Sequence, residues 1–163
     1  MARALVIGVG STLRGDDGVA SAVLDALQGQ VGPAVTLTAR HQLTPELSSD
    51  LAETDLTILV DADLNLPPGT VAARQVLSSP REARPDWHAP SLADCLALAL
   101  GLYSAKPDAW RVGVGVQDFD APDALSAAAR DAVPLAAGAV LAILASPTGP
   151  EWPPGVTGEA SGA

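Results

Sequence analysis

The stretch ALVIGVGSTLRGDDGVASAVLDAL, residues 4–27, decides the fold of this chain. Its first six residues, Ala4–Val9, are an apolar run that predicts a buried strand. The glycine-containing segment that follows predicts a loop, and residues 18–27 have apolar side chains at helical spacing. A strand, a loop and a helix in this order are the opening unit of a sheet that is covered by helices.

The remainder of the chain continues this alternation. Strand-like runs fall at residues 35–38, 56–62, 70–77 and 110–116. Further helices are predicted from Thr44-Pro45-Glu46 to Ala52, from a Ser91 cap to about Leu102, and from Asp123 onward, the last in one or two pieces around Pro134.

These elements predict a single α/β domain over residues 1–146. We expect a three-layer α/β/α architecture, with a mostly parallel, twisted sheet of about five strands and helices on both of its faces. Residues 147–163 are rich in Pro, Gly and small residues and lack periodicity, so a disordered tail is predicted there.

Composition and charge exclude several classes of function. The 163 residues include nine Lys and Arg against nineteen Asp and Glu, and this net charge of −10 disfavours nucleic acid and anionic membranes as partners. The lone cysteine, Cys95, is expected to be a small core residue and allows no disulfide within the chain. The longest apolar stretch, residues 132–145, is shorter than the roughly 20 residues that span a bilayer, and no signal-peptide pattern is present. We therefore expect a cytoplasmic protein without a membrane segment.

The loop after the first strand has the shape of a phosphate loop but the chemistry of a cation site. A Gly-x-Gly pattern ends at Gly10, but the position that a dinucleotide fingerprint reserves for a third glycine holds Leu13. The spacing from Gly10 to Gly15 fits a P-loop, yet Asp16 and Asp17 follow in place of Lys and Ser or Thr and would repel a phosphate. The two carboxylates either bind a cation or only cap the next helix, whose N-terminus favours negative charge.

Two further side chains are candidates for a site. Asp61 ends the strand at residues 56–62, and ligands of open α/β sheets bind at such strand ends, although an exposed turn acid is the alternative interpretation. His88 lies just before the helix capped by Ser91, but a lone loop histidine is more often without special function, and His41 is a weaker candidate still.

Considered together, Asp17, Asp61 and His88 indicate more than each does alone. Each follows a predicted strand or precedes a predicted helix, and these edges converge on one side of a doubly wound sheet. Two carboxylates and one imidazole suit a divalent transition-metal ion, and three ligands leave coordination positions open for a substrate.

At these residues the chain resembles the hydrogenase maturation endopeptidases, which remove the C-terminal extension of the large subunit of nickel–iron hydrogenases after nickel insertion. The family's Gly-x-Gly-Asn and Gly-Asp-Asp/Glu-Gly motifs correspond to residues 8–11 and Gly15–Gly18. The Asp that ends the family's third strand corresponds to Asp61, and the His before the next helix corresponds to His88. The resemblance covers residues 1–144.

The resemblance implies a site and a substrate. Asp17, Asp61 and His88 would bind nickel that the precursor itself presents, so that unloaded precursor is not cut, and other divalent ions may substitute. The candidate catalytic residues are Asp16, Asp17 and Asp61. Our hypothesis for the chemistry is a metal-polarised carbonyl or a metal-activated water, with Asp16 as an assisting base. The expected partner is the hydrogenase large-subunit precursor, and the protein is expected to be a monomer.

The chain departs from the family pattern at two places. Ser11 stands where the family usually has Asn, and residues 39–41 read Ala-Arg-His where many members have an acid followed by small glycines. The second departure bears on the substrate preference.

Two alternatives stay open at this point. A non-hydrolytic nickel-binding assembly or sensing module needs the same three ligands, and it would leave the length of a metal-loaded precursor unchanged. A small-molecule hydrolase or nucleotide binder would use the hydroxyls of Ser11 and Thr12, but the missing third glycine and the absent lysine argue against phosphate binding.

Overall fold

The structure, a computed structural model, describes residues 2–11, 15–78, 88–117 and 124–159. Its centre is a six-stranded sheet in the order β2-β1-β3-β5-β4-β6. The strands are β1 (Ala4–Val9), β2 (Val35–Arg40), β3 (Leu56–Asp63), β4 (Val71–Gln75), β5 (Asp108–Gly115) and β6 (Val156–Glu159). Every neighbouring pair is parallel except β4 and β5, which are antiparallel. The predicted α/β class with a mostly parallel sheet is confirmed, with one strand more than expected.

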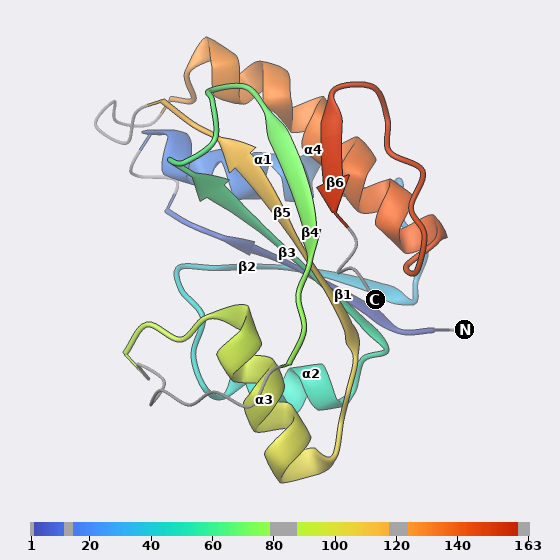
Figure 1. Cartoon of the computed structure of the whole chain (residues 1–163). Helices are drawn as coiled ribbons and strands as arrows, with labels where there is room; N and C mark the ends of the chain where they lie inside the picture. The colour runs from blue at the N-terminus through green and yellow to red at the C-terminus, as the bar shows by residue number, and fades with distance from the viewer. Residues whose placement is uncertain (1, 12–14, 79–87, 118–123, 160–163) are drawn as a thin grey trace.

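Helices cover both faces of this sheet (Figure 1). A short 3-10 turn, η1 (Gly15–Gly18), leads into α1 (Val19–Leu27), and α1 packs with α4 (Ala127–Ala145) on one face. The opposite face carries α2 (Leu47–Ala52) and α3 (Leu92–Tyr103), which also contact each other. The three predicted layers are therefore present.

The alternation of side chains along the strands produces two cores and fixes the face of the candidate site. Val6 and Ile58 are fully buried in the core beneath α1 and α4, whereas Ile7 and Leu59 are buried in the core beneath α2 and α3. Successive side chains of a strand point to opposite faces. Asp61, two residues after Leu59, therefore points to the α2 and α3 face.

Local capping explains where two of the helices begin. Ser91 accepts a hydrogen bond from the amide of Asp94, and the Asp94 carboxylate accepts one from the amide of Ser91, which is the predicted capping box at the start of α3. In α4 the hydroxyl of Ser126 accepts from the amide of Ala129. The helix then continues through Pro134 without the break that the proline made plausible.

Helix α4 is the one helix among the described residues that is long and apolar enough to cross a membrane, with 19 residues and a mean hydropathy of 1.6. It lies along the sheet (Figure 1) and contributes fully buried side chains, including Val140 and Ile143, to the core. Length and apolar composition of this kind are as typical of a buried core helix as of a membrane-spanning one, and α4 is a core helix in this structure.

The C-terminal segment corrects the expectation of a disordered tail. Residues 156–159 form β6, which pairs in parallel with β4 at the edge of the sheet. Trp152 packs edge-to-face on the buried Trp110, with ring centroids 5.5 Å apart, and the indole N–H of Trp110 donates to the carbonyl of Pro147. These contacts order residues 147–159 in spite of their Pro and Gly content, whereas residues 160–163 lie outside the described part of the chain.

Candidate functional site

The candidate site lies where β1, β3 and β5 end at the same edge of the sheet. Val9 at the end of β1 lies in register with Asp61 on β3, and Asp61 lies in register with Gly113 on β5. Because all three strands are parallel, the loop after β1 that leads into η1 reaches the same edge. This arrangement brings the acids of the first loop and of β3 into one region.

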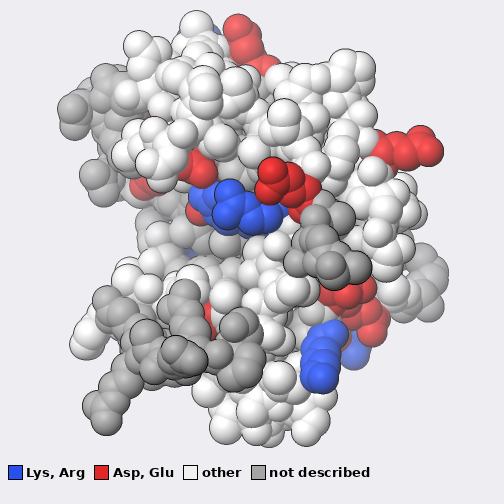
Figure 2. Space-filling view, in the orientation of Figure 1, with Lys and Arg blue, Asp and Glu red and all other residues white. Residues whose placement is uncertain are grey.

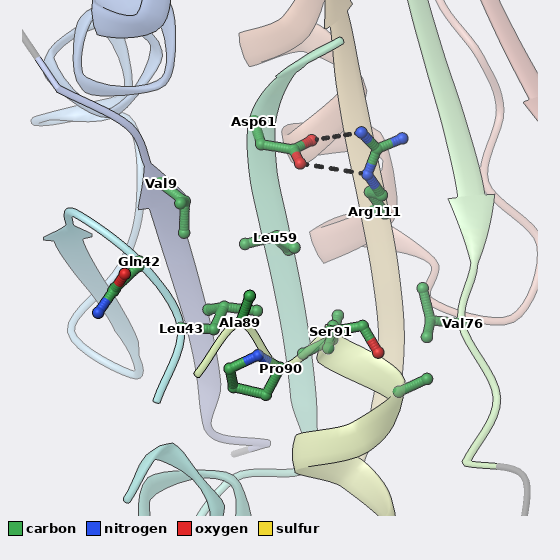
Figure 3. A pocket seen from close by; sticks show the side chains of 12 residues that line it. Val9, Gln42, Leu43, Leu59, Asp61, Val76, Ala89, Pro90, Ser91 and Arg111 are labelled. Carbon is green, nitrogen blue, oxygen red and sulfur yellow. Dashed lines mark hydrogen bonds and ion pairs between the residues drawn. The ribbon is translucent and has the colours of Figure 1, made fainter. Parts of the chain in front are cut away.

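A cavity of about 470 Å³ opens between this edge and the start of α3 (Figure 3). Most of its lining is apolar, with Val9, Leu43, Leu59, Val76, Pro90 and Leu92 among the lining residues. Among the described residues, the charged members of the lining are Asp61 and Arg111. An apolar hollow with a small number of charged groups is the usual form of a binding site for a small molecule or a peptide side chain.

The charged part of the site is an ion-pair network centred on Arg111 (Figure 3). Nη2 of Arg111 lies 3.0 Å from Oδ1 of Asp61, and Nε donates to Oδ2 of the same carboxylate at 3.3 Å. Nη1 donates to Oδ2 of Asp63 at 3.0 Å. The three side chains are partly buried, with exposed fractions of 31% for Arg111, 26% for Asp61 and 12% for Asp63.

The environment of Asp61 changes its proton affinity. Burial raises the pKa of Asp61 from 3.8 to about 6, even though the charge and hydrogen bond of Arg111 act in the opposite direction. The negative charges of Asp63 and Asp17 raise the pKa of Asp61 further. The Oδ1 atom of Asp61 is buried, and its contact with Nη2 of Arg111 is an ion pair that lacks hydrogen-bond geometry, so the ionised form is incompletely solvated. Perturbed acids of this kind are typical of functional sites.

Asp63 has the opposite shift. Burial acts to raise its pKa, but hydrogen bonds from the backbone N–H of Asn65 and from Arg111 outweigh burial and lower it. At neutral pH Asp63 is therefore the more firmly ionised of the two acids on β3.

Asp17 lies at this edge and is held by the first loop. Its Oδ2 accepts a hydrogen bond from the backbone N–H of Ser11 at 2.8 Å. Gly10 has a φ of +147°, and a Cβ at that position would overlap the carbonyl oxygen of Asp17. The glycine of the predicted motif therefore allows the loop to pass close to the Asp17 backbone.

Asp16 has a different environment from the one expected of a catalytic base. Its side chain is 1% exposed and accepts hydrogen bonds from the amides of Gln117 and Ser126 and from the hydroxyl of Ser126. These bonds tie η1 to the segment after β5 and to the start of α4. The contacts favour a positioning role for Asp16, and its role as a base stays a prediction.

His88 is exposed and directly precedes Ala89, which lines the cavity. Within the described parts of the chain, no group of three or more His, Cys, Asp or Glu side chains is close enough to hold a metal ion. Asp17, Asp61 and His88 therefore do not form a preassembled metal centre in the described parts of the chain, and their role as ligands stays a prediction. His41 is exposed, and Cys95 is buried, as expected of a core residue, with its pKa raised to about 11 by burial.

Arg111 and Asp63 are the charged members of the site that the sequence analysis missed. The signal for Arg111 was present, because a charged residue inside the run WRVGVGV needs a partner if that strand is buried. Its partners could not be assigned without the strand order, which places β5 next to β3.

The comparisons with known proteins are consistent with this geometry. No protein-family model and no curated protein sequence matches the chain. Among solved structures, a hydrogenase maturating endopeptidase HybD from E. coli is 25% identical with a TM-score of 0.71, and the match covers 89% of this chain and 93% of that one. An endopeptidase from Escherichia coli is 26% identical with a TM-score of 0.67 and coverages of 91% and 95%. A hydrogenase 2 maturation peptidase from a Thaumarchaeota archaeon is 25% identical with a TM-score of 0.65 and coverages of 87% and 97%.

The matches extend over nearly the whole of each chain, and they agree with the family that the Gly-Asp-Asp-Gly loop, Asp61 and His88 indicated. The predicted resemblance is thereby confirmed: over most of its length, the structure of this chain is similar to the structures of hydrogenase maturation endopeptidases.

Proposed function

We propose that this protein is an endopeptidase that removes the C-terminal extension of a nickel–iron hydrogenase large-subunit precursor after nickel insertion. The observation that carries the proposal is the placement of Asp61 in the wall of an apolar cavity at the edge of a sheet whose fold is that of hydrogenase maturation endopeptidases. A peptide segment of the precursor would place apolar side chains in the cavity and its reacting bond near the acids.

The acidic edge supports recognition of a metal ion that the precursor carries. The negative charge of Asp17 is close enough to raise the pKa of Asp61, and Arg111 neutralises only part of the negative charge of Asp61 and Asp63. Carboxylates and an imidazole are suitable ligands for nickel and other divalent transition ions. We propose Asp17, Asp61 and His88 as ligands that reach the ion when the precursor binds.

The chemistry at this edge would combine positioning with charge. Nickel bound in the precursor would supply Lewis acidity, while Asp61 and Asp17 supply negative charge beside it. Asp16 would act indirectly, because its hydrogen bonds to Gln117 and Ser126 hold η1, and therefore Asp17, in place.

We further propose that the protein works as a monomer in the cytoplasm. A single cysteine, Cys95, whose thiol is buried and unpaired, fits a reducing compartment.

The test is to incubate the protein with a nickel-loaded large-subunit precursor and with the same precursor without nickel, and to follow precursor mass. We expect shortening of the loaded precursor alone, and a rate at least about a hundredfold lower for Asp61→Asn. Asp55→Asn is the matched control, because Asp55 is an exposed acid next to the opposite end of β3, and it should stay within about twofold of wild type.

Three results would change the proposal. Equal cleavage of both precursors would exclude recognition through nickel. A precursor that binds but keeps its length would indicate the non-hydrolytic nickel-binding module instead. A precursor that neither binds nor changes length would exclude both functions.

A further inference from the structure

Arg111 contacts both carboxylate oxygens of Asp61. Two of its guanidinium nitrogens face the two carboxylate oxygens of Asp61, at 3.0 Å and 3.3 Å. The Oδ1 atom of Asp61 is shielded from solvent in this arrangement. Any metal ion that binds Asp61 must therefore replace, or at least share, the contact that Arg111 now makes.

A second acid, Asp63, can keep Arg111 bound when the contact between Arg111 and Asp61 breaks. Asp63 accepts from Nη1, whereas Asp61 faces Nε and Nη2, so the two carboxylates use different nitrogens of the guanidinium. Rotation of the guanidinium away from Asp61 can thus leave the bond to Asp63 in place. The Asp63 carboxylate is itself held in place, since it also accepts a hydrogen bond from the amide of Asn65 at 2.8 Å.

The backbone leaves room for this arrangement at Gly113. A Cβ at residue 113 would lie 3.2 Å from Nη1 of Arg111, which is a tight contact, and 3.4 Å from Oδ2 of Asp63, which is an ordinary one. A glycine at this point of β5 therefore allows the guanidinium and the Asp63 carboxylate to meet above the strand.

We propose that Arg111 is a specificity-determining residue that competes with metal ions for Asp61, and that Asp63 retains the guanidinium when a metal-bearing precursor displaces it. This inference rests on the proposed function, because it concerns how the same site selects its ligand. Competition from Arg111 weakens the binding of free divalent ions to Asp61. When a precursor carries the ion, contacts between its peptide and the cavity offset the free-energy cost of displacing Arg111.

The direct test is calorimetric titration of Ni²⁺ and Zn²⁺, each alone, into wild type and Arg111→Gln. We expect metal binding about five- to tenfold tighter in Arg111→Gln, because one partly exposed ion pair no longer has to be broken. Arg111→Lys keeps the charge but cannot face both oxygens of Asp61, so an intermediate affinity is expected. Thermal melting of each variant checks that it is folded.

Arg74→Gln is the matched control. Arg74 lies opposite Arg111 in the register of β4 and β5, is exposed, and within the described residues makes no ion pair with Asp61. Its removal changes the net charge equally, so metal affinity should change by less than about twofold. An equal gain in Arg74→Gln and Arg111→Gln, or no gain in Arg111→Gln, would overturn the inference.

A double-mutant cycle tests the role of Asp63. In the wild-type background Asp63→Asn should weaken metal binding about threefold or more. Two causes contribute to this loss: the displaced Arg111 no longer has an anionic partner to hold it, and one negative charge near the metal ion is removed. In the Arg111→Gln background the anchoring part disappears and the loss should be clearly smaller. Equal losses in both backgrounds would show a simple charge effect and would remove Asp63 from the proposal.

The precursor assay distinguishes failure of this inference from failure of the proposed function. Cleavage of loaded precursor by wild type, together with unchanged metal affinity in Arg111→Gln, would leave the peptidase intact and exclude competition by Arg111. Tighter metal binding in Arg111→Gln without any precursor cleavage would support competition by Arg111 and exclude the peptidase function. With both correct, free Zn²⁺ should inhibit precursor cleavage by Arg111→Gln at concentrations about five- to tenfold lower than it inhibits wild type.

Discussion

At the scale of the single residue, the main conflict in this protein is at Asp61. Its position on β3 places a carboxylate against apolar side chains, and Arg111, its cationic partner among the described residues, is shared with Asp63. The pKa of about 6 means that Asp61 destabilises the folded state when it is ionised. An acid kept under such conditions in an otherwise well-packed sheet is explained by function more readily than by stability.

This conflict predicts how Asp61→Asn changes stability with pH. The folded-state pKa is raised above the ordinary 3.8, so the stabilising contribution of the protonated acid is complete below about pH 4 and is lost as pH rises through 6. The free energy of unfolding of Asp61→Asn relative to wild type should therefore increase by about 2–3 kcal/mol between pH 4 and pH 7. Urea denaturation at a series of pH values measures this difference.

Asp63→Asn is the control for that measurement and should have the opposite sign. The pKa of Asp63 is lowered in the folded state, so its contribution is present above its ordinary pKa and is lost as pH falls. Asp63→Asn should thus become less stable relative to wild type as pH rises. Parallel pH profiles for the two variants would contradict the environments that the structure gives these acids.

The residues show which parts of the site a sequence can predict. Asp17 and Asp61 could be chosen as candidates because strand ends and loops between a strand and a helix are recognisable patterns. Arg111 could not be assigned a role, because its partner on β3 is 50 residues away in the chain. Asp16 was predicted to be an assisting base beside Asp17. Its hydrogen bonds to Ser126 join residues 110 positions apart in the chain and indicate a structural role, which the local sequence cannot reveal.

At the scale of the element, periodicity and capping predicted the helices and strands that local sequence specifies, whereas the remaining elements depend on tertiary packing. The helix after Ser91 and the strand that contains Asp61 have strong local signals, and both are present. The last strand, β6, has the short sequence VTGE, which is neither strongly apolar nor long. It is ordered because its neighbour β4 offers a free edge and because Trp152 covers the adjoining surface.

This dependence predicts the effect of Trp152→Ala. Loss of the edge-to-face contact with Trp110 and of the cover over Gly158 should lower the free energy of unfolding by about 2 kcal/mol. Trp152→Phe keeps an aromatic ring beside Trp110 and should lose less than half as much. Guanidinium denaturation of the three proteins measures the order, and a Trp152→Ala variant as stable as wild type would show that the C-terminal segment does not contribute to the fold.

At the scale of the whole molecule, topology converts scattered sequence signals into one site. The order β2-β1-β3-β5 places the ends of three parallel strands side by side, so residues from the first loop, from β3 and from β5 meet although they are far apart in the chain. Figure 2 shows basic and acidic side chains gathered together on the face seen there. The acids still outnumber the bases over the molecule, and nineteen carboxylates against nine cations leave the folded chain with net self-repulsion.

That excess predicts a salt effect opposite to the one expected of a protein stabilised mainly by surface ion pairs. Raising NaCl from 20 to 200 mM at pH 7 shortens the Debye length and screens the repulsion, so Tm should rise by about 2–4 °C. Reversing two exposed acids, Asp25→Lys with Glu53→Lys, changes the net charge from −10 to −6, since each reversal adds two charges, and should reduce the rise. A Tm that falls with salt would mean that attractive pairs such as Arg40–Asp50 and Arg111–Asp61, and not the acidic excess, dominate the electrostatic free energy of the fold.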